Sequence, residues 1–140
     1  MGEKITYRFD KGFGVPEWLE LFKTSHYNHW WTARNARAAL DYAHLVVTAW
    51  DGAAAVGTLA VWSDGVNFAV IDDVVVHPEY RGRGIGTLLM RKALGRLEPL
   101  GLSFVQLLPV PGRESFFARL GFAVQPDARV MDLVTQAKSE

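Results

Sequence analysis

The stretch DDVVVHPEYRGRGIGTLLMRKAL, residues 72–94, contains two groups of residues that can do chemistry. In the first, Gly82, Gly84 and Gly86 stand at alternate positions between an apolar run and an amphipathic, helix-like pattern. The first amides of a helix have no partner within the helix and carry partial positive charge, and glycine lets a ligand come close to the backbone. The stretch therefore predicts a cradle for a pyrophosphate at the start of a helix.

Two arginines accompany these glycines. Arg81 and Arg83 add positive charge, and a guanidinium pairs well with a phosphate. A P-loop is excluded because no Gly-Lys pair follows, and the dinucleotide fingerprint fails because Thr87 stands where it needs a third glycine. The remaining pattern is R-x-x-G-x-G, which Arg81 opens. A nucleotide-binding protein that uses the same turn stays open as an alternative.

The second group is a pair of adjacent carboxylates, Asp72 and Asp73, inside the apolar run. The period of two in a strand directs them to opposite faces, so one of them should face a cleft. Two acids flanked by Ile71 and Val74 are unusual for a purely structural strand. The alternative is that one aspartate is solvated and the other pairs with a neighbouring arginine.

The elements that must position these groups follow from periodicity and turn residues. Their order is strand, two helices, three strands, helix, strand, helix, strand. The three consecutive strands indicate antiparallel hairpins, and the later strand–helix–strand unit implies a parallel pair. We therefore predict one mixed α/β domain over residues 1–140. The expected strands are 4–9, 44–50, 55–62, 66–77, 103–108 and 129–134, and the expected helices are 16–25, 32–43, 84–98 and 112–122.

The composition excludes several classes of protein. The 140 residues are 49% hydrophobic, which is enough for a packed core, and the 15 basic and 15 acidic residues balance. A general nucleic-acid binder normally has a basic excess, so no nucleic-acid partner is expected. The absence of cysteine excludes disulfides and cysteine nucleophiles and fits a reducing cytosol. No apolar stretch approaches the about 18 residues that span a bilayer, and a soluble, cytoplasmic protein is predicted.

Two motifs in this order resemble the GNAT superfamily of acyl-CoA-dependent N-acyltransferases. The family has a strand, a proline-containing turn and Q/R-x-x-G-x-G/A opening a helix, as in VVVHPEYRGRGIGTLLM. It also ends its last helix with an aromatic residue shortly before Gly-Phe, as Phe117 precedes Gly121-Phe122 in FFARLGF. The resemblance covers nearly the whole chain in element order. It implies the GNAT fold, a mostly antiparallel central sheet with a splayed parallel pair.

The resemblance also implies acetyl-CoA as co-substrate and no metal. The turn amides would bind the pyrophosphate, the strand edge would pair with the pantetheine arm, and an amide near Val76 would polarise the thioester carbonyl. The implied cofactor-binding residues are Val74, Val75, Val76, Arg81, Gly82, Arg83, Gly84, Ile85, Gly86, Thr87 and Phe117.

The catalytic groups match the family only in part. Many members place an acidic Tyr where this chain has Phe117, and Phe has no proton to donate to the leaving thiolate. Water, or one of Tyr27, Tyr42 and Tyr80, is a substitute. For the base that makes the amine neutral, Asp72 and Asp73 are the leading candidates.

The segment HYNHWW lies where this family borders the acceptor. His26, Tyr27, Trp30 and Trp31 could line a pocket for an aromatic or cationic amine. The alternative, which we favour, is that the aromatics pack the helices onto the sheet. His26 and His29 lack an evident third ligand, so a metal site is not predicted.

The resulting hypothesis is an acetyl-CoA-dependent N-acetyltransferase that acts on a primary amine of a small molecule. Transfer would be direct, in a ternary complex, because there is no cysteine to carry the acyl group. The alternative is an acyl-CoA-binding module without transferase activity, which Phe117 motivates. No membrane partner is expected, and the resemblance is compatible with a homodimer.

Overall fold

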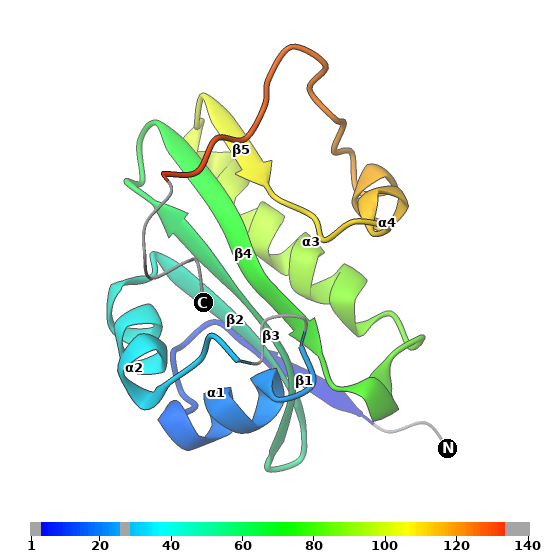
Figure 1. The fold of residues 1–140 in the computed structure, drawn as a ribbon. Helices are drawn as coiled ribbons and strands as arrows, with labels where there is room; N and C mark the ends of the chain where they lie inside the picture. The colour runs from blue at the N-terminus through cyan, green and yellow to red at the C-terminus, as the bar shows by residue number, and fades with distance from the viewer. Residues whose placement is uncertain (1–3, 26–28, 134–140) are drawn as a thin grey trace. The chain divides into compact units, whose positions relative to one another are not determined.

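The structure is a computed structural model, and it describes residues 4–25 and 29–133. The chain divides into two compact units, Met1–Leu108 and Pro109–Glu140. The first unit holds a five-stranded sheet in the order β1-β2-β3-β4-β5 (Figure 1). The strands are β1 (Ile5–Arg8), β2 (Leu45–Asp51), β3 (Ala54–Ser63), β4 (Phe68–Val76) and β5 (Phe104–Leu107).

The first four strands pair antiparallel, and β5 pairs parallel with β4. The parallel pair follows from α3 (Ile85–Leu97), because a crossover helix is needed to bring the chain back in the same direction. The mixed α/β class, with antiparallel hairpins and one parallel pair, is thereby confirmed.

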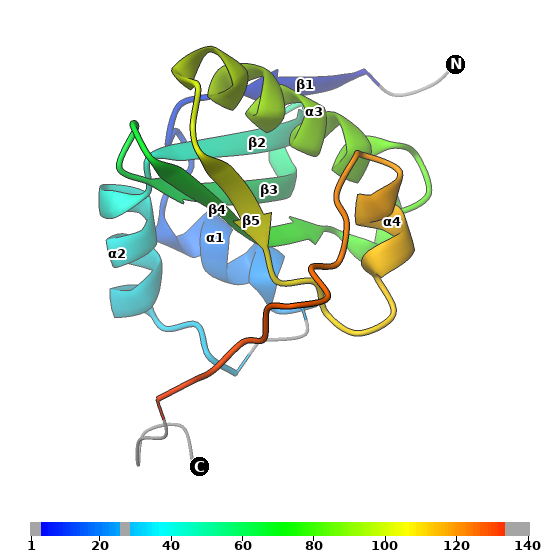
Figure 2. The same ribbon diagram turned by 90° about the horizontal axis from the view of Figure 1, so that it is seen from above.

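Helices cover both faces of this sheet (Figure 2). One face carries α1 (Val15–Phe22) and α2 (Ala33–Tyr42), and the other carries α3. Aromatic side chains join α1 to the sheet: the Trp18 ring of α1 stacks on Phe13 with centroids 5.7 Å apart, and Phe13 meets Trp50 of β2 edge-on at 6.2 Å. Such pairs stabilise a core beyond the area they bury.

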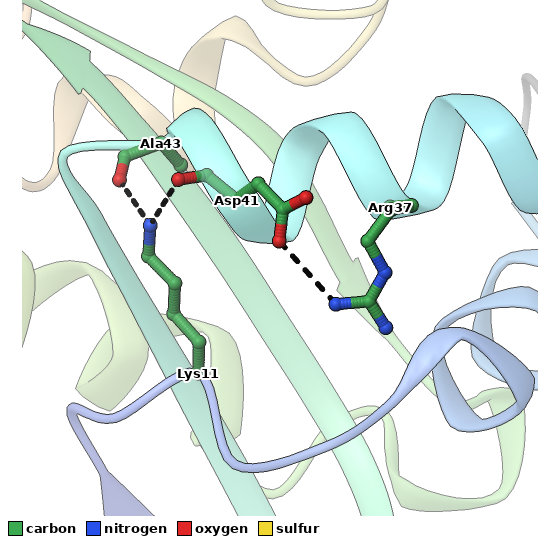
Figure 3. A network of polar contacts seen from close by, with 4 residues as sticks. All are labelled: Lys11, Arg37, Asp41 and Ala43. Carbon is green, nitrogen blue, oxygen red and sulfur yellow. Dashed lines mark hydrogen bonds and ion pairs between the residues drawn. The ribbon is translucent and has the colours of Figure 1, made fainter.

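A lysine ties the loop after β1 to the end of α2 (Figure 3). The ammonium of Lys11 donates to the carbonyl oxygen of Ala43 at 2.6 Å and to that of Asp41 at 3.4 Å. These carbonyls lie at the C-terminal end of α2, where they lack helical partners and the helix carries partial negative charge. The Asp41 carboxylate also meets Arg37 at 3.3 Å, one turn earlier on the exposed surface.

Replacing Lys11 by methionine should lower the free energy of unfolding by about 1 kcal/mol, because charged donors to helix carbonyls contribute on this scale. Urea unfolding measures this loss as a lower urea concentration at the midpoint of the transition. Arg37→Met is the matched control and should cost less than about 0.5 kcal/mol, as exposed ion pairs do. Equal losses in the two variants would show that Lys11 does not cap α2.

The second unit contains α4 (Glu114–Ala118), which is shorter than the predicted helix over 112–122. Its end is closed by a Schellman motif, in which Phe122 N–H donates to Phe117 O at 3.2 Å and Gly121 N–H to Ala118 O at 3.0 Å. Gly121 has φ +100°, which requires glycine. Gly121 therefore ends this helix, and the Phe117 and Phe122 rings meet edge-on at 6.3 Å.

The predicted strand over 129–134 is wrong for residues 129–133, which are described and form no strand. Their β-prone side chains are exposed, including Met131 and Leu133. A strand needs a neighbour to complete its hydrogen-bond ladder, and side-chain propensity alone does not supply one.

Candidate functional site

The site begins where β4 and β5 part. Their parallel pairing runs from Phe68–Phe104 to Ile71–Leu107. β4 then continues to Val76 while β5 ends (Figure 1). Within the described part of the first unit, β4 therefore has an edge without a β5 partner beyond Ile71.

The hydrogen bonds of β4 show which backbone groups face this edge. His77 N–H donates to Val56 O of β3 at 2.8 Å. Because backbone groups alternate along a strand, Val76 directs its N–H and C=O away from β3. The Val76 carbonyl indeed accepts from Nε of Arg81 at 3.1 Å, on the opposite side from β3. The Val76 amide thus faces the unpaired edge.

A β-bulge lies between the parting of the strands and Val76. Thr58 pairs with Val75 and Ala60 with Asp72, so Leu59 lies opposite two residues of β4, Asp73 and Val74. Asp73 has φ +56° and is the one non-glycine with positive φ among the described residues. Aspartate tolerates this region better than most residues. A bulge bends a strand, which accounts for the divergence of β4 from β5.

The two aspartates occupy different environments. Asp72 is exposed, and its Oδ1 accepts the Asp73 N–H at 2.8 Å, whereas Asp73 is half-buried. Burial, followed by the negative charge of Asp72, raises the pKa of the Asp73 carboxyl to about 7. A carboxylate with a pKa near neutrality is suited to take a proton at physiological pH. Among the described residues, neither Asp72 nor Asp73 forms a salt bridge with an arginine, as the alternative required.

The glycine-rich turn follows directly. Gly82 has φ +77° and Gly84 has φ +79°, and Gly84 is the N-cap of α3. A Cβ at either position would meet no other atom within 4 Å, so the backbone angle, not crowding, requires glycine there. The first helical hydrogen bond is Leu88 N–H to Gly84 O at 3.0 Å. The amides of Ile85, Gly86 and Thr87 precede it, as a cradle for an anion needs.

The seating of this helix on the sheet also depends on glycine. A Cβ on Gly57 of β3 would lie 3.2 Å from Leu89 and 3.3 Å from Ile85 of α3. It would also lie 3.3 Å from the backbone oxygen of Val75. The missing side chain lets the start of α3 pack closely against β3, next to the strand that carries the bulge.

Comparison with known proteins identifies the family of this chain. Residues 11–122 match the family described as acetyltransferase (GNAT) family. The chain belongs to the GNAT family. A GNAT acetyltransferase from Streptococcus pneumoniae TIGR4 has the same fold, with a TM-score of 0.83, 26% identity, and coverage of 95% of this chain and 99% of that one. The family match runs across both compact units.

Two further comparisons concern one curated relative and one solved structure. Serotonin N-acetyltransferase 2, chloroplastic, of rice (Oryza sativa subsp. japonica) is 42% identical over 65 residues, which cover 46% of this chain and 32% of that protein. An aminoglycoside N-acetyltransferase in complex with CoA shares the fold at a TM-score of 0.71 and 16% identity, over 97% of each chain. This chain spans between 32% and 41% of the length of the first curated relatives that it matches.

The segment HYNHWW, which is expected to border the acceptor, is only partly described. His26 and Tyr27 lie outside the described residues. Trp31 packs on Trp18 with ring centroids 4.9 Å apart and on Phe22 at 5.0 Å, so it contributes to the core. Trp30, in contrast, is 55% exposed, and His29 is exposed too. Trp30 is thus the described aromatic of this segment that remains free to meet a ligand.

Phe117 stands where many GNAT members have the tyrosine acid, and the side chains considered as its substitutes are Tyr27, Tyr42 and Tyr80. Phe117 belongs to the second unit, where it closes the helix end described above. Tyr42 is 77% exposed at the end of α2, and Tyr27 lies outside the described residues. The Tyr80 hydroxyl donates to the Asp51 carboxylate. Sequence reasoning missed this contact, which joins residues 29 positions apart.

Two searches of the described residues complete the picture. Among them, no cluster of three or more His, Cys, Asp or Glu side chains is arranged to hold a metal ion. No helix in the described ranges is both long and apolar enough to cross a bilayer.

Proposed function

We propose that this chain is an acetyl-CoA-dependent N-acetyltransferase that acetylates a primary amine of a small molecule by direct attack in a ternary complex. The observation that carries the proposal is that three features follow one another along the chain, from β4 to the start of α3. The bulge with Asp73, the unpaired edge with the Val76 amide and the helix cradle that begins at Gly84 follow one another within twelve residues. The family match and the relatives named N-acetyltransferases support it.

The cradle fits the anionic end of acetyl-CoA. The amides of Ile85, Gly86 and Thr87 would donate to pyrophosphate oxygens at the positive end of α3. Arg83 is exposed beside them and adds charge. The unpaired edge at residues 74–76 would hydrogen-bond the two amides of pantetheine as an added strand does. The GNAT fold of the CoA-bound aminoglycoside acetyltransferase supports this assignment.

Acetyl-CoA would supply the acetyl group as a thioester. The Val76 N–H would donate to its carbonyl oxygen and stabilise the negative charge that develops there. Asp73, with its pKa raised to about 7, would accept a proton from the substrate ammonium, so that a neutral amine attacks. The Asp72 carboxylate would accept the Asp73 N–H, and its negative charge would help to raise the pKa of Asp73. The leaving thiolate would take its proton from water, because Phe117 has none to give.

The acceptor class that we propose is an apolar or aromatic amine. The exposed Trp30 supports this choice, since an indole face attracts both aromatic rings and cations. The rice relative named for serotonin supports it as well. The proposal places the enzyme in the cytoplasm, in keeping with a chain without cysteine.

Release of CoA thiol from acetyl-CoA tests the proposal. The panel comprises serotonin, tryptamine, simple arylalkylamines, polyamines, amino acids and aminoglycosides, with a no-amine control. We expect saturable release with an arylalkylamine and little with polyamines. No release with any amine, despite CoA binding, would contradict the proposal.

That outcome would favour the second candidate, an acyl-CoA-binding module. Phe117 is the observation behind it, because many family members have a tyrosine acid there. Under this reading Phe117→Tyr creates amine-dependent release where there was none. Under our proposal it changes the rate only modestly.

A further inference from the structure

We propose that Asp51 and Tyr80 form a positioning pair that holds the pyrophosphate turn, so that the preference for CoA over shorter thioesters depends on a residue outside the glycine motif. The inference rests on the proposed function. It concerns two side chains that the glycine motif does not include, one of them on a different hairpin.

The pair connects a rigid element to the turn. Asp51 is the last residue of β2 and is held on both sides, opposite Ile5 of β1 and Ala54 of β3. Tyr80 ends the 3₁₀ turn Pro78–Tyr80, one residue before Arg81. Its hydroxyl donates to Oδ2 of Asp51, and both side chains are at least partly buried. A charge-assisted hydrogen bond of this kind is among the stronger ones in proteins.

The Tyr80 ring contacts an arginine of the glycine-rich turn. The guanidinium carbon of Arg83 lies 4.9 Å from the ring centroid, in a cation–π contact. On another side, the His77 ring meets Tyr80 edge-on at 5.9 Å. The Nδ1 of His77 in turn accepts the Glu79 N–H at 3.1 Å. Asp51 thus orients Tyr80, and Tyr80 orients Arg83.

Arg81, the other arginine of the turn, makes a different contact. Nε of Arg81 donates to Val76 O at 3.1 Å, so part of its guanidinium is committed to the end of β4. Arg83 stands between Gly82 and Gly84, two exposed glycines with positive φ that give the turn no side-chain packing. The contact with Tyr80 therefore constrains the direction of the Arg83 guanidinium, which we propose meets the pyrophosphate.

The experiment compares Tyr80→Phe and Asp51→Ala with the unchanged chain. Each removes the hydrogen bond, and Tyr80→Phe keeps the ring beneath Arg83. We expect Kd for CoA and KM for acetyl-CoA to rise about tenfold, as loss of a charged hydrogen bond predicts, with kcat within about twofold. Asp51→Asn keeps an acceptor oxygen and should restore most of the affinity. The double variant should be no worse than either single one, because both break the same bond.

S-acetyl-pantetheine, which has no pyrophosphate, is the control substrate. Its kcat/KM should be the same in all of these variants. Tyr7→Phe, which removes the hydroxyl of a tyrosine on β1, is the control substitution and should change nothing. Equal losses with acetyl-CoA and S-acetyl-pantetheine, or unchanged CoA affinity beside a lower Tm, would overturn the positioning role.

Binding of CoA, measured by calorimetry, separates the two proposals. CoA binding that weakens in Tyr80→Phe supports the pair even if no amine is ever acetylated, in which case only the proposed function fails. If the unchanged chain does not bind CoA, both proposals are wrong.

Discussion

Asp73→Asn should lower kcat/KM for the amine by a factor of about 10²–10⁴, the range that a positioned general base contributes. Asparagine has nearly the same shape and tolerates the left-handed backbone that Asp73 adopts at φ +56°. The bulge should therefore persist, and CoA binding should stay within about twofold. Initial rates with acetyl-CoA at saturation, beside calorimetric CoA binding, provide the measurement.

The pH profile identifies the group. Because Asp73 must be ionised to accept a proton, kcat should rise with pH through the pKa of about 7 and then level off. Asp72→Asn is the matched control, since it removes the neighbouring charge that helps to raise this pKa. Its acid limb should move to lower pH while its plateau stays within about fivefold. A profile that does not move in Asp72→Asn, or a fully active Asp73→Asn, would exclude Asp73 as the base.

The pH dependence of the free energy of unfolding tests the raised pKa of Asp73 independently of activity. The folded pKa of Asp73, about 7, is above the unfolded value, so folding opposes ionisation. Below about pH 4 the carboxyl is protonated in both states and no penalty exists. The cost of ionising Asp73 in the folded protein grows between about pH 4 and 7. Above that range it reaches its full value, about 1.4 kcal/mol for each unit by which folding raises the pKa. Asp73→Asn should therefore stabilise the protein by up to about 4 kcal/mol at pH 8 and by almost nothing at pH 4.

The sequence predicted the elements around this aspartate but not its conformation. Alternation and glycine placement are local signals, and they located β4, the turn and α3 to within a few residues. A period of two, however, directs Asp72 and Asp73 simply to opposite faces. The bulge at Asp73 depends on the register against Leu59, which lies on another strand. The one local sign was two aspartates in an apolar run, because Asp accepts positive φ.

Longer-range features were less predictable for the same reason. The bond between Tyr80 and Asp51 joins the 3₁₀ turn after β4 to the end of β2 and leaves no periodic trace in the sequence. The β-prone segment over 129–133 has the side chains of a strand yet forms none, since pairing is decided by a neighbouring edge. In the acceptor segment, Trp30 and Trp31 are adjacent and of one type, but Trp31 packs in the core and Trp30 is exposed.

Gly84→Ala should weaken CoA binding by about 2–3 kcal/mol, about a hundredfold, if α3 holds the pyrophosphate as proposed. Gly84 is the N-cap of α3, and a methyl group there would fill open space at the helix start, where the amides of Ile85 and Gly86 are proposed to donate to phosphate. Phosphate oxygens would be kept from these donors, and charge-assisted hydrogen bonds of about 1.5–3 kcal/mol each would weaken. Calorimetric titration with CoA measures the loss.

Backbone strain must be separated from this effect, because Gly84 has φ +79° and alanine there also costs about 1–2 kcal/mol of folding free energy. Gly84→Asn provides the separation, since asparagine accepts this conformation. It should recover most of the stability lost in Gly84→Ala while CoA binding stays poor. Gly95→Ala makes the same substitution at an exposed position in the last turn of α3, where a Cβ meets nothing within 4 Å. It should leave CoA affinity unchanged and raise stability by about 0.5–1 kcal/mol, so a loss of affinity there, or full affinity in Gly84→Asn, would argue against the cradle.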